Sequence, residues 1–181
     1  AQESRGLGDV YKRQGDERVL DYLLPLNIKP NVQTWRGLWF EGHFGEWKNL
    51  LTSYCTGDYI FQIDADEMIG IDLIESLPLI LEANPEVDVF LTPRINTVEG
   101  LTQQYIDQWR WNVNDKGWVN FPDYQWRIYK NSPDIKWKNK VHEVLDGYKT
   151  TALLPAEELF CLIHPKTIDR QVKQNNYYDT L

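Results

Sequence analysis

Cysteine is scarce in this chain of 181 residues, which contains only Cys55 and Cys161. Neither cysteine belongs to a C-x-x-C pair or to a cluster rich in histidine, so a zinc site is not expected. Two cysteines also allow at most one disulfide, which excludes a scaffold held together by many bridges. We expect a reduced intracellular chain, and a single disulfide is the alternative left open.

Long apolar runs and an excess of positive charge are also missing. No stretch approaches the roughly 20 apolar residues that a membrane-spanning helix needs. The 27 Asp and Glu residues outnumber the 19 Lys and Arg residues, which gives a net charge of -8. A general nucleic-acid partner is therefore not expected. We expect a cytoplasmic protein, with peripheral association at the inner face of the membrane as an alternative.

Aromatic residues, by contrast, are abundant, with 8 Trp and 10 Tyr. One interpretation is a rich core, since 42% of the residues are hydrophobic and the length suffices for one domain with a real core. The other is a sugar site, because flat aromatic faces stack on the apolar faces of pyranose rings. Four tryptophans are candidates for such a groove, although most are expected in the core: Trp109, Trp111, Trp118 and Trp126.

The first 14 residues differ from the rest of the chain. Residues 9–14 read DVYKRQ, a peptide that the DNA string GATGTGTATAAGAGACAG encodes and that matches a transposon end used in sequencing libraries. We expect residues 1–14 to be an adapter artefact from a metagenomic assembly, with a genuine disordered tail as the alternative. Residues 15–181 are then expected to form a single domain, with Gly15-Asp16-Glu17 as a remnant that follows a missing first strand.

Helical and strand patterns alternate along the first half of the chain. Apolar periodicity predicts helices over 16–24, 46–54, 72–83 and 167–181. Runs of β-branched and aromatic residues predict strands over 32–35, 59–63, 87–94, 124–129, 135–137, 141–145 and 159–163. Such alternation favours an α/β layered sheet.

The strongest chemical signal is a cluster of carboxylates after the strand predicted over 59–63. Asp64, Asp66 and Glu67 are close enough in sequence to repel one another, so a positive group should compensate them. Divalent Mg²⁺ or Mn²⁺ is the usual compensator, because hard cations prefer oxygen ligands. Alternation along a strand would put Asp64 and Asp66 on one side, where they can share a metal. The alternative is a solvated acidic turn.

Six motifs in order resemble glycosyltransferase family 2, and among its branches the lipopolysaccharide core glucosyltransferases. The resemblance covers roughly residues 32–181. The motifs are Trp47-Lys48-Asn49, Thr56-Gly57-Asp58-Tyr59-Ile60, Asp64-Ala65-Asp66-Glu67, Asp123-Tyr124-Gln125-Trp126-Arg127-Ile128-Tyr129, Val141-His142-Glu143, and Ile163-His164 followed by Lys166.

The resemblance implies a GT-A fold and an inverting transfer from a nucleotide-diphosphate sugar to a glycan or lipid-linked acceptor. It also implies a divalent metal, Mn²⁺ or Mg²⁺, held by Asp66 with support from Asp64 and by His164. His142 is a weaker candidate for the metal, and a structural role is the alternative for either histidine. His43 is not expected to be a ligand.

The remaining site residues follow from the same resemblance. Glu143 is the first candidate for the general base and Asp123 the second; a salt-bridged residue at a strand end is the alternative for Glu143. Lys48, Asp64 and Arg127 are expected to contact the donor. For Lys48 the alternative is a helix-surface role, and for Arg127 it is an ordinary exposed position in a strand.

The family pattern is incomplete at the front of the chain, where its first strand and its Asp-Gly-Ser type of loop do not occur. We therefore expect this chain by itself to bind donor weakly or not at all. Three rival interpretations stay open: a catalytically inactive carbohydrate-binding protein on the same scaffold, a metal-dependent phosphatase or nuclease, and a structural domain whose carboxylates cap a helix. The second rival is less favoured, because two-metal sites need more Asp and His ligands than this chain offers.

Overall fold

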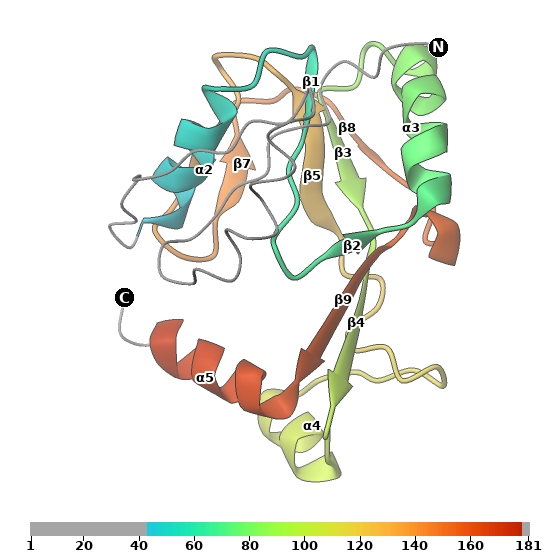
Figure 1. Ribbon diagram of the computed structural model, residues 1–181, viewed down its shortest axis with the longest axis vertical. Coiled ribbons are helices and arrows are strands. Elements are labelled where there is room, and N and C mark those ends of the chain that lie inside the picture. The colour runs from blue at the N-terminus through green and yellow to red at the C-terminus, as the bar shows by residue number, and fades with distance from the viewer. Residues whose placement is uncertain (1–42, 179–181) are drawn as a thin grey trace, which may run out of the picture. The chain divides into compact units, whose positions relative to one another are not determined.

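The computed structural model describes residues 43–178. The features predicted over 1–14, 15–17, 16–24 and 32–35 lie outside these residues. Within the described range the chain divides into two compact units, described here as unit 1 (43–61 and 130–147) and unit 2 (62–129 and 148–178). The described residues form both helices and strands, so the chain is mixed α/β, which confirms the predicted class (Figure 1). The single domain and the GT-A fold stay predictions.

Unit 1 is built around the helix α2 (Phe44–Thr52), predicted two residues later at each end. His43 precedes the helix and caps it, because its Nδ1 accepts the N–H of Glu46 at 3.2 Å. The helix packs on the strand β6 (Lys136–Lys138), and Asn49 fixes this contact. Its amide nitrogen donates to the carbonyl of Trp137 at 2.9 Å, and its amide oxygen accepts the N–H of Trp137 at 2.8 Å.

The strand β7 (Val144–Asp146) pairs antiparallel with β6, and unit 1 also contains the short strand β1 (Tyr59–Phe61). β1 ends two residues before the predicted strand 59–63 does. Four apolar residues form the buried core of this unit: Ile60, Ile135, Trp137 and Leu145.

Two strands at the start of unit 2 match predicted ones. β3 (Val89–Thr92) falls within the strand predicted over 87–94, and β5 (Gln125–Lys130) overlaps the one predicted over 124–129. They pair antiparallel, and on its other edge β3 pairs parallel with β8 (Thr151–Leu153). The sequence analysis missed β8, which is only three residues long and exposes Leu153. Val89, Phe90, Ile128 and Tyr129 of these strands are buried in the core, as are the polar residues Thr92 and Arg127.

A second sheet in unit 2 carries most of the polar residues discussed below. Its middle strand is β9 (Leu162–Thr167), paired antiparallel with β2 (Met68–Ile69) and parallel with β4 (Arg94–Glu99). The register sets Asn96 of β4 beside His164 of β9. Because β4 and β9 run parallel, the helices that follow them, α4 (Gln103–Trp109) and α5 (Ile168–Tyr178), begin at the same end of the pair (Figure 1).

Helix α3 (Ile71–Ala83) follows β2 and matches the helix predicted over 72–83, with Pro78 inside it. It buries Leu73 and Leu77. The strand predicted over 159–163 instead begins with a 3-10 turn, η2 (Glu158–Phe160), before β9 starts. Among residues 43–178 no helix has the length and apolar character needed to cross a membrane.

Gly147 offers a test of the packing in unit 1, and Gly117 of unit 2, which has a similar φ angle, is its control. Gly147 has φ +85° and a Cβ placed there would lie 1.9 Å from the carbonyl oxygen of Asp134, whereas Gly117 has φ +76° and open space around it. Gly117→Ala should therefore lower the free energy of unfolding by about 1 kcal/mol through backbone strain alone. Gly147→Ala should cost about 1–3 kcal/mol more, because backbone atoms must also shift. Urea unfolding compares the two variants, and equal losses would contradict this packing.

Candidate functional site

The acidic motif lies in a turn rather than on a strand. The N–H of Glu67 donates to the carbonyl of Asp64 at 3.0 Å, which closes a turn over residues 64–67. The prediction that strand alternation puts Asp64 and Asp66 on one side is therefore wrong, because β1 has already ended at Phe61. The turn directs the two side chains to different partners: Asp64 accepts from Arg127, and Asp66 accepts from Arg170.

Glu67 is the buried centre of the site, with its side chain 0% exposed. Its Oε1 accepts hydrogen bonds from Arg127 at 2.7 Å and from Arg94 at 2.9 Å. Its Oε2 accepts the N–H of Asp64 at 3.1 Å. A carboxylate buried this deeply needs charged partners and hydrogen bonds of this kind. Two arginines of the chain itself thus compensate part of the acidic cluster.

Arg127 is held in β5 with only 3% of its surface exposed. Burial opposes its charge, yet the carboxylates of Asp64 and Glu67 raise its pKa above the ordinary value. The alternative interpretation of Arg127 as an ordinary exposed strand residue is therefore wrong. Its predicted contact with the donor stays a prediction, and in the structure the guanidinium binds the acidic turn.

Arg94 extends the network from Glu67 to Asp123. Both Nε and NH2 of Arg94 donate to Oδ2 of Asp123, at 2.9 and 2.7 Å. The same oxygen accepts from the amide nitrogen of Asn96 at 2.8 Å, and Oδ1 accepts from Gln125 at 2.7 Å. Because an ionised carboxylate can only accept hydrogen bonds, Asp123 fixes which end of the Asn96 amide faces it.

The oxygen of the Asn96 amide faces His164, which is 4% exposed. Oδ1 of Asn96 lies 2.7 Å from Nδ1 of His164. On the opposite side of the ring, Nε2 lies 3.4 Å from Oδ2 of Asp66, which also accepts from Arg170 at 2.9 Å. The hydrogen bond to His164, together with the charges of His164 and Arg170, holds the pKa of Asp66 well below its usual range despite partial burial.

Asp66 and His164 suit a divalent ion in chemistry and spacing. Carboxylate oxygen and imidazole nitrogen are both ligands for Mn²⁺, and two such donors on one ion, with bonds of about 2.1 Å at right angles, lie about 3 Å apart. The observed separation of 3.4 Å is close to that spacing. Asp64 does not join them, since among residues 43–178 no three His, Cys, Asp or Glu side chains converge as a metal site. The predicted metal role of Asp64 stays a prediction.

A cavity of about 210 Å³ in unit 2 brings the predicted residues Asp123 and His164 together. Basic, amide and apolar side chains also line it: Arg94, Asn96, Trp111, Val119, Lys166 and Gln171. Lys166 donates to the amide oxygens of Gln171 and Gln174, at 3.3 and 2.7 Å. Burial lowers the pKa of Lys166, in line with a cation withdrawn from water. The cavity therefore combines a partly buried cation, an acid and one aromatic face.

Glu143, the first candidate for the general base, lies in unit 1. Its Oε1 binds Nζ of Lys48 at 2.9 Å, with both side chains less than one fifth exposed. Nζ of Lys48 also lies 4.3 Å from the ring centre of Trp137. These contacts match the salt-bridge interpretation of Glu143 without testing its catalytic role, and the donor contact predicted for Lys48 stays a prediction. His142, the weaker metal candidate, is exposed and has φ +53°.

The four tryptophans considered for a sugar groove have different surroundings. Trp111 lines the cavity and lies against Trp109, whose ring stacks with Tyr105 at 4.9 Å. Trp118 contacts Phe121 instead, and Trp126 is half-buried in β5. Only Trp111 of these four is thus placed to contact a molecule in the cavity.

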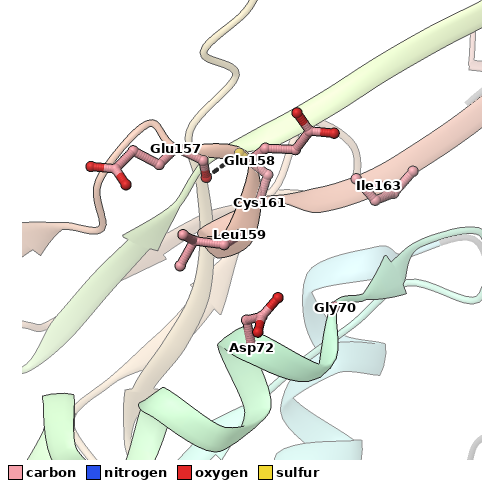
Figure 2. Close-up of a pocket in the computed structure, with 7 residues that line it drawn as sticks. All are labelled: Gly70, Asp72, Glu157, Glu158, Leu159, Cys161 and Ile163. Carbon is pink, nitrogen blue, oxygen red and sulfur yellow. Dashed lines mark hydrogen bonds between the residues drawn. The ribbon is translucent and has the colours of Figure 1, made fainter.

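A larger and more open groove of about 480 Å³ lies elsewhere in unit 2, between the start of α3 and η2. Glu157, Glu158 and Asp72 line it with Leu159 and Ile163. Figure 2 shows the side chains of Glu157 and Glu158 pointing away from each other, and Cys161 donating its thiol to the carbonyl of Glu157 at 3.2 Å. Burial raises the pKa of Cys161 to about 11, so its thiol is unreactive. The groove gathers no convergent polar set.

Sequence reasoning missed four residues of the site: Arg94, Asn96, Lys166 and Arg170. Arg94 and Asn96 alternate along β4, so a period of two in polar residues was the available signal for a shared face. Lys166 stood within a family motif but had no assigned role. Arg170 reaches Asp66 from a helix more than 100 positions away, and nothing local in the sequence indicates such a pairing.

A comparison of the chain with models of known protein families finds no match. The resemblance to glycosyltransferase family 2 therefore stays a prediction.

The buried ion pair of Arg127 with Glu67 leads to a test of stability. Arg127→Met should lower the free energy of unfolding by about 3–5 kcal/mol, because it removes one of the charges that balance a fully buried carboxylate. Lys116→Met is the matched control: its pair with Glu158 has side chains 62% and 67% exposed, so the change should stay below about 1 kcal/mol. Urea unfolding measures both, and similar losses would contradict a central role for Glu67.

The lowered pKa of Asp66 predicts a loss of stability in acid. A carboxylate whose pKa is lower in the folded state gives stability that is complete above its unfolded pKa, about 3.9, and is lost as the pH falls through the folded value. Asp66→Asn removes this dependence. Below about pH 4 the unfolding free energy of the wild type should therefore fall toward that of the variant, by at most about 1.4 kcal/mol per pH unit.

Urea unfolding at a series of pH values measures this convergence. Asp115→Asn is the control at an exposed carboxylate, and its curve should stay parallel to that of the wild type. Parallel curves for Asp66→Asn as well would show that the contacts of Asp66 do not stabilise the folded chain.

Proposed function

We propose that this chain is part of an inverting glycosyltransferase of the GT-A type, which transfers a sugar from a nucleotide-diphosphate donor to a glycan or lipid-linked acceptor. The observation that carries the proposal is the pairing of Asp66 with His164, whose oxygen and nitrogen face each other at 3.4 Å. His164 also lines the cavity that contains Lys166 and Trp111. The order of the sequence motifs supplies the reaction class.

Asp66 and His164 are the residues that would hold a Mn²⁺ or Mg²⁺ ion. The chemistry that such an ion supplies is neutralisation of the negative charge that develops on a diphosphate leaving group. Two protein ligands are enough for this role, because metals of this kind take their remaining ligands from substrate phosphates and water.

Lys166 supports the binding of a phosphate group in the cavity. Its ammonium donates hydrogen bonds to the neutral amide oxygens of Gln171 and Gln174, at 3.3 and 2.7 Å. A charge-assisted bond from a partly desolvated ammonium to a phosphate oxygen is stronger than one in water. Trp111, on the wall of the same cavity, offers a flat face for a sugar ring.

A transferase of this class also needs a base that takes the proton of the acceptor hydroxyl. Asp123 lines the cavity, but its two oxygens accept four hydrogen bonds from Arg94, Asn96 and Gln125. With these hydrogen bonds Asp123 is better suited to orienting its neighbours than to taking a proton. Glu143, by comparison, forms one ion pair, with Lys48 at 2.9 Å. We therefore retain Glu143 as the first candidate for the base.

The proposal is tested by the release of nucleoside diphosphate from a panel of nucleotide sugars, with Mn²⁺ present or removed by chelator. Donor is raised to millimolar concentration, because weak binding is expected of this chain. Release from one donor that requires Mn²⁺ and falls at least about 100-fold in Asp66→Ala is the expected result, since the variant loses one of two metal ligands. Asp72→Ala is the control at an acidic residue outside the cavity.

The remaining outcomes separate the alternatives. Donor binding with no release, detected by calorimetry, would favour the inactive carbohydrate-binding protein. Release that is unchanged by chelator and by Asp66→Ala would contradict the proposed site. Where release is found, Glu143→Gln and Asp123→Asn distinguish the two candidate bases, because the base variant should keep its affinity for donor and lose turnover.

A further inference from the structure

We propose that Asn96 is a positioning residue that keeps Nδ1 of His164 protonated and so turns the Nε2 nitrogen, with its lone pair when the ring is neutral, toward Asp66. The inference concerns the same site as the proposed function and rests on it for its catalytic meaning. Its structural content, the protonation of one named nitrogen, can be measured independently of any activity.

The argument begins with the orientation of the Asn96 amide. Its nitrogen donates to Oδ2 of Asp123 at 2.8 Å and lies 3.4 Å from the carbonyl oxygen of Val119. Both of these groups accept and neither donates, so the amide nitrogen must face them. Asp123 is in turn held in place by Arg94, which donates two hydrogen bonds to the same oxygen.

The orientation of the amide then determines the protonation of the imidazole. Oδ1 of Asn96 lies 2.7 Å from Nδ1 of His164, and an amide oxygen can only accept, so Nδ1 must carry the hydrogen. A neutral imidazole in water favours the opposite form, protonated at Nε2, so the protein selects the less common tautomer. The side chain of His164 is 5% exposed, which removes competing water.

The selected form explains the contact with Asp66. Nε2 faces Oδ2 of Asp66 at 3.4 Å, where a bare nitrogen and a carboxylate oxygen would repel each other. Either a proton on Nε2 or a cation between the two atoms relieves this repulsion. In both cases the hydrogen on Nδ1 faces Asn96, and Nε2 is the nitrogen that faces Asp66. A second hydrogen bond of this kind is what orients histidine ligands in metal sites generally.

The register of the sheet makes this arrangement rigid. Asn96 and His164 are paired positions on the parallel strands β4 and β9, and an isolated bridge joins Asn96 to Val119. The two side chains therefore emerge from neighbouring backbones of one sheet. Asn is also the only residue type of its size that can donate to Asp123 and accept from His164 at once without carrying a charge.

The test is the protonation pattern of the His164 ring by ¹H–¹⁵N correlation NMR, above the pH at which the ring becomes neutral. The chain has 3 His, and a His164→Gln spectrum assigns the signal. We expect Nδ1 to carry a hydrogen in the wild type. Asn96→Leu should shift the ring toward the Nε2-protonated form, while Asn112→Leu, the same change at an exposed asparagine, should leave it unchanged.

A second variant keeps the test decisive if Asn96→Leu does not fold. Asn96→Asp keeps an acceptor oxygen opposite Nδ1 of His164, so the wild-type pattern should persist in that variant. A wild-type ring without a hydrogen on Nδ1, or a pattern unchanged in Asn96→Leu, would overturn the proposal.

The binding of Mn²⁺ alone, followed by the EPR signal of the free ion, separates this inference from the proposed function. Asn96→Leu should weaken Mn²⁺ binding by about 10–100-fold. Equal Mn²⁺ affinity in the variant and the wild type would overturn the positioning role while leaving the metal site in place. A protonation pattern that depends on Asn96 in a chain that binds no Mn²⁺ would support the positioning role and overturn the proposed metal-dependent function.

Discussion

The carboxylate of Glu67 is the constraint on which the rest of the site depends. Its side chain is fully buried, so leaving it without cationic partners would cost several kcal/mol. Arg127 and Arg94 both meet this need, and each brings its own strand to the acidic turn. Glu67 therefore fixes the turn that carries Asp64 and Asp66 relative to β5 and β4.

The sequence predicts that charged residues gather at this site better than it predicts which residues pair with one another. Strand patterns place β5 and the acidic motif, and the carboxylate cluster correctly indicates that positive groups must gather around it. The identity of those groups depends on tertiary structure. Arg94 follows the acidic turn by 27 positions, and Arg170 follows Asp66 by 104. No local pattern reports such distant partners.

The same limit explains the errors in the elements. Helices α2 and α3 have clear apolar periodicity, so their predicted positions agree to within two residues. The predicted strand over 59–63 is two residues too long, because β1 ends at Phe61 and the chain then forms the turn over residues 64–67. β8 is too short for any pattern to emerge, and only pairing with β3 makes it a strand. Tertiary contacts overrode local preference in both cases.

The arginines also determine the direction of every hydrogen bond between Glu67 and His164. A guanidinium can only donate, so Glu67 and Asp123 act as acceptors on either side of Arg94. Asp123 then requires a donor from Asn96, which leaves the amide oxygen of Asn96 to accept from His164. Each step has one permitted direction, because the arginine charge is permanent at any pH the protein meets. The hydrogen on Nδ1 of His164 thus follows from the buried carboxylate of Glu67 through three side chains, those of Arg94, Asp123 and Asn96.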